Sequence, residues 1–191
     1  ADSLYYLSAI AYKELQENDK ALEILENLYD KTKDEGIKKL SINQIEIIIL
    51  QMDVDECMKH LFEIINTASK VNTKNDYQNI LARVYEKNYL FNEANDIYIN
   101  QLKESSNVNA NETRYKIAVN LMYVKDYKGA LEYLNVLLSQ RGNKKYLEDA
   151  LFLSYLANYS LGQSKDALKI LLNLYYNYPE SKKRFDIAKN L

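Results

Sequence analysis

The stretch "SLGQSKDALKILLNLYYNYPES" at residues 160–181 sets a glycine, an alanine and the only proline of the chain among large apolar residues. Leucines follow Ala167 by four and seven residues, a spacing that places all three on one face of a helix. Gly162 lets the chain turn out of a preceding helix, and Pro179 ends the helix that contains Ala167. Ser181 can cap a following helix. The stretch therefore predicts two helices that pack closely at the small side chain of Ala167.

This small position recurs at nearly equal intervals along the chain. The segments "ENDKALEIL", "DVDECMKHL", "LFNEANDIY", "DYKGALEYL" and "QSKDALKIL" align on Ala21, Cys57, Ala94, Ala130 and Ala167, which are 36, 37, 36 and 37 residues apart. A second helical pattern precedes each of them, and a short polar turn separates the two. Two helices joined by a short turn lie antiparallel, and one such pair cannot bury its apolar faces alone. The repeat therefore predicts an all-α solenoid of five stacked helix pairs.

The five units divide the chain into nearly equal parts. Their approximate bounds are 2–37, 38–74, 75–110, 111–147 and 148–184, and the start of a further helix follows. We expect them to form a single domain over residues 1–191. Both ends of the chain fall within helical patterns, so we also expect the sequence to be part of a longer protein.

The second unit is the least regular. Its segment "SINQIEIIILQMD" at residues 41–53 is rich in isoleucine, which locally favours a strand. The segment is in phase with four helical neighbours, however, and tertiary context often overrides local propensity. We therefore predict a helix here as well.

Composition and motifs argue against catalysis and against several classes of ligand. A net charge of −2 provides no overall basic field for nucleic acid, and the apolar runs are too short to span a membrane. The single cysteine, Cys57, and the single histidine, His60, cannot form a zinc cluster, and we expect Cys57 to be buried and unreactive. Asp53, Asp55 and Glu56 are expected at a helix start, where they favour the helix dipole. We therefore predict no catalytic residue, no cofactor and no metal site.

The repeat resembles the tetratricopeptide repeat family over all five units. The resemblance rests on small and aromatic residues at fixed places in each unit, namely Tyr5, Ala9, Tyr12, Ala21, Ala82, Tyr85, Ala94, Ala118, Ala130, Gly162, Ala167 and Pro179. The second unit departs from the pattern, because Ile45 and Cys57 stand at its two small positions, and we expect looser helix packing there. The resemblance implies a right-handed superhelix whose first helices line a concave groove.

The resemblance also places the groove residues, at one, five and eight positions after the start of each unit's pattern. These are Tyr6, Ile10, Lys13, Ile42, Glu46, Ile49, Asn79, Arg83, Glu86, Tyr115, Val119, Met122, Phe152, Leu156 and Tyr159. The Lys/Asn set with which some family members clamp a C-terminal carboxylate is missing. The groove of units four and five is apolar and aromatic, which fits an apolar peptide or a partner helix. The same side chains could instead pack between adjacent first helices, and both interpretations stay open at this point.

The stretch "YYNYPES" at residues 175–181 ends the helical pattern of the fifth repeat and is similar to repeat ends in bacterial envelope proteins. Examples of such proteins are the periplasmic Tol–Pal-associated protein and the outer-membrane assembly lipoprotein. We therefore predict a non-catalytic scaffold that binds a partner peptide or helix in a bacterial envelope assembly, with the periplasm favoured over the cytoplasm. A peptide-sensing signalling or transcription regulator, with its effector segment outside this sequence, is the alternative. A homodimer through exposed ends of the solenoid is a further prediction. Nucleic acid and direct membrane insertion are not expected.

Overall fold

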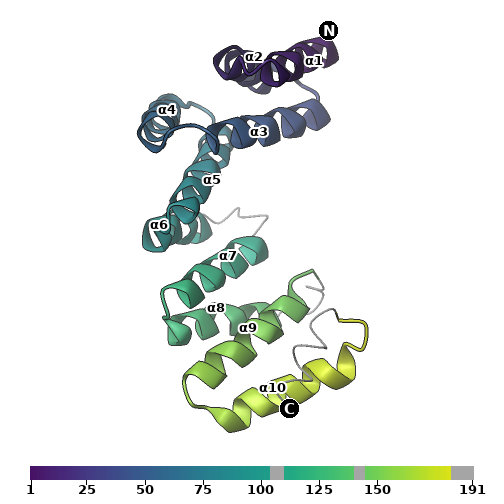
Figure 1. Cartoon of the computed structure of the whole chain (residues 1–191), viewed down its shortest axis with the longest axis vertical. Helices are drawn as coiled ribbons and strands as arrows, with labels where there is room; N and C mark the ends of the chain where they lie inside the picture. Colours follow the sequence, from purple (N-terminus) through teal and green to yellow (C-terminus); the bar gives the residue numbers. More distant parts are fainter. Residues whose placement is uncertain (104–109, 140–144, 182–191) are drawn as a thin grey trace. The chain divides into compact units, whose positions relative to one another are not determined.

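The computed structural model describes residues 1–103, 110–139 and 145–181. These residues form ten α-helices and no strand, which confirms the predicted all-α fold with two helices in each repeat (Figure 1). The helices are α1 (Asp2–Glu14), α2 (Asn18–Lys31), α3 (Glu35–Ile49), α4 (Val54–Thr67), α5 (Val71–Lys87), α6 (Phe91–Lys103), α7 (Ala110–Tyr123), α8 (Tyr127–Ser139), α9 (Leu147–Ser160) and α10 (Ser164–Asn177). The further helix predicted at the end of the chain lies outside the described residues.

The chain divides into two compact units, residues 1–87 with α1 to α5 and residues 88–191 with α6 to α10. In the first unit, α2 packs against α1 and α3, and α4 packs against α5. In the second unit, α7 packs against α6 and α8, and α9 packs against α8 and α10 (Figure 1). The pairs α1–α2, α7–α8 and α9–α10 therefore pack as the sequence predicts for the two helices of one repeat, while a single domain over the whole chain stays a prediction.

The small anchor residues are buried in the core. All five anchors, Ala21, Cys57, Ala94, Ala130 and Ala167, are at most 2% exposed. In the second unit, Ala130 of α8 belongs to a core cluster with Ala118 of α7 and Ala150 of α9. Three small residues on three helices let the backbones approach closely, and a larger side chain would push the helices apart.

The isoleucine-rich segment of the second repeat is helical, as predicted. Ile45, Ile48 and Ile49 of α3 are fully buried, so tertiary burial outweighs the local strand propensity. The Asp34 carboxylate caps the start of α3 by accepting hydrogen bonds from the backbone N–H groups of residues 36 and 37, at 2.9 and 3.1 Å. The two helices of the second repeat, α3 and α4, approach each other less closely than α1 and α2 of the first repeat do. This agrees with the looser packing expected from larger residues at the small positions.

Four of the turns inside the helix pairs have one residue in the left-handed conformation, two positions before the second helix. This residue is Gly162 in the fifth repeat, with φ +72°, but Gln16, Tyr89 and Lys125 hold the same place with φ of 62–63°. The backbone N–H of the residue that follows donates a hydrogen bond to a carbonyl of the preceding helix. In the fourth repeat this bond runs from the N–H of residue 126 to the carbonyl of residue 121, at 2.9 Å. Glycine adopts this conformation without the steric cost that a side chain adds.

We expect Lys125→Gly to raise the free energy of unfolding by up to about 1 kcal/mol, because it removes that steric cost. Gly162→Ala should lower the free energy of unfolding by about 1 kcal/mol, because it adds a side chain to a residue in the left-handed conformation. No atom lies within 4 Å of the new methyl group, so the cost comes from the backbone conformation alone. Urea denaturation measures both. Glu132→Gly, at an exposed position inside α8, is the control and should be destabilising by about 1 kcal/mol. Equal losses from Lys125→Gly and Glu132→Gly would contradict the turn argument.

Candidate functional site

The predicted groove residues of the fourth repeat lie on α7 and are partly buried. Tyr115 stacks on Tyr146, with ring centroids 5.0 Å apart and an angle of 24° between the planes. Tyr115 and Met122 also pack against the core cluster that contains Ala118 and Ala130. Val119 is half-buried on the same helix. These side chains thus contribute to packing, and each still presents part of its surface to solvent.

The groove residues of the fifth repeat lie on α9 and range from packed to exposed. Phe152 and Leu156 pack against a second core cluster, which includes Tyr155 and Leu171. The Tyr155 ring lies 6.1 Å from that of Phe152 and 6.2 Å from that of Tyr159. Tyr159 is 66% exposed. The result is an aromatic row on α9 that begins in the core and ends in solvent.

The groove residues of the first unit behave differently, because three of the charged ones, Lys13, Glu46 and Arg83, have partners within the chain. Lys13 of α1 donates to the Gln44 side chain of α3 at 2.9 Å, and Arg83 of α5 forms an ion pair with Glu46 of α3. Each contact joins the first helices of neighbouring repeats. Of the remaining predicted groove residues of these helices, Ile49 is fully buried and belongs to the core. The others are half-buried, namely Tyr6, Ile10, Ile42, Asn79 and Glu86. A partner-binding role for this set stays a prediction.

Cys57 and His60 of α4 each interact with a different group. The buried Cys57 thiol donates to the Val54 carbonyl at 3.1 Å, and burial raises the pKa of this thiol, which keeps it protonated. The His60 Nε2 atom lies 2.6 Å from the Glu26 carboxylate of α2. Asp53 caps α4 by accepting from the backbone N–H of residue 55 at 2.9 Å, which matches its predicted place at a helix start.

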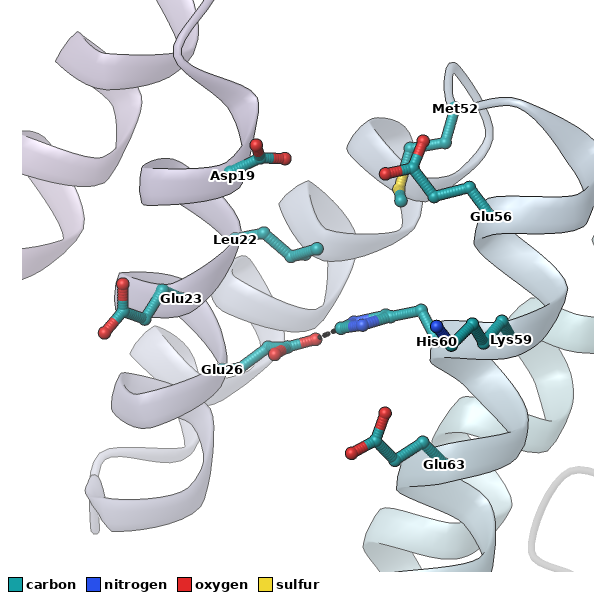
Figure 2. A pocket seen from close by; sticks show the side chains of 9 residues that line it. All are labelled: Asp19, Leu22, Glu23, Glu26, Met52, Glu56, Lys59, His60 and Glu63. Carbon is teal, nitrogen blue, oxygen red and sulfur yellow. Dashed lines mark hydrogen bonds and ion pairs between the residues drawn. The ribbon is translucent and has the colours of Figure 1, made fainter.

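A pocket of about 350 Å³ opens between α2 and α4 in the first unit. Figure 2 shows Glu26 and His60 pointing toward one another across it, with Leu22 and Met52 near one end. Carboxylates dominate the lining, which consists of Asp19, Leu22, Glu23, Glu26, Met52, Glu56, Lys59, His60 and Glu63. Sequence reasoning missed this pocket, because its two walls come from different repeats and no local pattern joins them.

Two further features of the second unit carry no signal in the sequence. Tyr89, 82% exposed, packs edge-on to Phe91, which stacks on Tyr123 with centroids 4.7 Å apart and planes 4° apart. Between α6 and α7, the buried Asn120 amide donates to the Asn95 side chain at 3.1 Å. Both arrangements depend on how two repeats meet.

In residues 1–103, 110–139 and 145–181, no helix is both long and apolar enough to cross a membrane. In the same residues, no group of three or more His, Cys, Asp or Glu side chains is arranged to hold a metal ion.

Comparisons with known proteins agree with this architecture. Residues 2–31, which contain α1 and α2, match the tetratricopeptide repeat model. A Podosopora anserina protein assigned as a kinesin light chain, with nearly identical TPR-like repeats, is similar in structure, with a TM-score of 0.58 and 17% identity over 90% of this chain and 92% of that chain. RapI in its apo form is also similar, with a TM-score of 0.63 and 16% identity over 94% of this chain and 54% of RapI. Identities this low show the fold alone, and this chain spans about half the length of RapI. None of the curated proteins matches the chain.

Proposed function

The chain contains a tetratricopeptide repeat and has the fold of that family over most of its length, and from this we propose that it is a non-catalytic scaffold for protein–protein interaction. We place its binding surface, within residues 88–191, on the aromatic face of α7 and α9. The expected occupant is an apolar peptide or a helix of a partner protein.

The observation that carries this proposal is the aromatic row of Phe152, Tyr155 and Tyr159 on α9. Tyr155 is buried and Phe152 packs against the core, so the base of the row is held in place. Tyr159 extends from this base into solvent. A rigid aromatic side chain loses little conformational entropy on binding, which is why such residues often dominate the binding energy.

The charged groove residues of the first unit support an apolar rather than an acidic partner. Lys13 and Arg83 already bind Gln44 and Glu46 within the chain. A partner carboxylate would have to displace these contacts, and at Arg83 the exchange of one ion pair for another yields little free energy. Burial of apolar surface at α7 and α9 therefore supplies the expected affinity.

We expect Tyr159→Glu to weaken partner binding about tenfold or more, because it places a charge in an apolar contact. The wild-type chain and the variant would serve as baits in a lysate of the source cell, and the affinity of each captured protein would then be measured with purified components. Tyr159 is mostly exposed, so the substitution should leave helicity unchanged in circular dichroism.

Tyr176→Glu is the matched control, because Tyr176 is a tyrosine of similar exposure, 72%, on the second helix α10. A partner that is retained by this control and lost by Tyr159→Glu supports the proposed surface. A partner that binds all three baits equally would show that α7 and α9 do not form the binding surface.

The finer predictions remain within this proposal. The class of the captured partner distinguishes an envelope assembly from the alternative of a peptide-sensing regulator.

The homodimer is a further proposal, for which the exposed leucines Leu4 and Leu7 of α1 and Leu168 of α10 would supply apolar contact area. Sedimentation equilibrium tests it, and a monomer at every concentration would exclude it.

A further inference from the structure

We propose that the contact between His60 and Glu26 is a pH-dependent link between the first two helix pairs. His60 is on α4 and Glu26 is on α2, and their side chains meet at 2.6 Å across the pocket of Figure 2. The two side chains are only 27% and 24% exposed, respectively, so solvent screens this pair less than a fully exposed one. Protonation of the imidazole puts opposite charges on the two partners and turns this contact into a hydrogen-bonded ion pair, which is the stronger form.

Glu26 is held in position from a third helix. The Tyr77 hydroxyl of α5 donates to the same Glu26 carboxylate oxygen at 3.4 Å, and the Tyr77 ring packs edge-on to Tyr29 at 6.1 Å. Tyr29 in turn donates to the Asp76 carboxylate of α5 at 2.5 Å. The His60 imidazole and the Tyr77 hydroxyl thus contact the same carboxylate oxygen of Glu26, which keeps this oxygen directed toward His60.

The other groups around His60 also favour its charged form. The lining carries one cation against several carboxylates, and the Tyr77 hydroxyl of α5 contacts Glu26. The groups concerned are Asp19, Glu23 and Glu26 on α2, Glu56, Lys59 and Glu63 on α4, and Tyr77 on α5. The excess of negative charge lowers the free energy of the imidazolium ion.

The direction of the pH effect follows from these contacts. The hydrogen bond to Glu26 raises the pKa of His60 above 6.5, and burial opposes it with a smaller effect. A raised folded-state pKa means that the stabilisation is fully present below the unfolded pKa and is lost as pH rises through the folded value. The link between α2 and α4 is therefore strongest under mildly acidic conditions.

The chain has a single histidine, so its imidazole resonance in proton NMR can be followed against pH without assignment ambiguity. We expect the wild type to titrate above 6.5 and Glu26→Gln to titrate at a lower pH than the wild type. Glu23→Gln removes one negative charge from the same helix and the same pocket without removing the contact, so it should shift the titration less. A wild-type pKa at or below 6.5, or equal shifts in the two variants, would overturn the proposal.

The effect on stability is a second, independent readout. The Tm difference between the wild type and His60→Gln should be largest below pH 6.5 and should shrink as the pH rises through the NMR-derived pKa. In the Glu26→Gln background, His60→Gln should produce a Tm difference that changes less with pH than in the wild-type background, because only the remaining carboxylates act on His60. A pH-independent difference in the wild-type background would show that His60 contributes packing only.

Discussion

Leu134→Ala is expected to lower the free energy of unfolding by about 2–5 kcal/mol, the range for a buried leucine whose site collapses only partly. Leu134 is fully buried in the second unit, within the cluster that joins α7, α8 and α9. The alanines around it are already small, so neighbouring side chains can fill little of the cavity. Urea denaturation followed by circular dichroism measures the loss.

The matched control is Val136→Ala, because Val136 lies two residues along the same helix and is exposed. It should change the free energy of unfolding by about 0.5 kcal/mol or less. If the two substitutions had similar effects, α8 would not present the face that the structure assigns to the core.

Tyr77→Ala should have an effect of similar size in the first unit, a loss of about 3–5 kcal/mol. Tyr77 is buried on α5, where its ring packs against Tyr29 of α2. Its removal leaves a ring-sized cavity and takes one of two partners from the Glu26 carboxylate. Thermal and urea denaturation should both show the loss.

Tyr77→Phe separates the two contributions, because it keeps the ring and removes only the hydroxyl. We expect it to cost about 0.5–1.5 kcal/mol, the usual net contribution of one hydrogen bond. The contact to Glu26 is long at 3.4 Å, which favours the lower end of this range. A loss as large as that of Tyr77→Ala would mean that the hydroxyl, rather than ring packing, dominates at this position.

Much of the fold could be predicted because its signals are local and repeated. The spacing of Ala21, Cys57, Ala94, Ala130 and Ala167 predicts five helix pairs, and each of these residues is buried. Gly162 and Pro179 mark a turn and a helix end in the structure as they do in the sequence. Even the isoleucine-rich α3 could be identified as a helix from its phase within the repeat.

The candidate site could be predicted only in outline. Family resemblance places Tyr115, Met122 and Phe152 on one face, but the resemblance does not show how much of each side chain packs against its neighbours. The structure shows all three against the core and leaves Tyr159 exposed. No sequence pattern distinguishes these cases, because the exposure of a helical residue depends on the next repeat.

The sequence by itself determined the helices, the turns between them and the small positions that are buried, because helical period, turn residues and small side chains act over a few residues. Only the tertiary structure decided which side chains meet between repeats. Glu26 and His60 are 34 residues apart and lie on different helix pairs, yet they form one contact at 2.6 Å. The distance between two such atoms depends on how neighbouring helices rotate and pack, and this depends on every side chain between them.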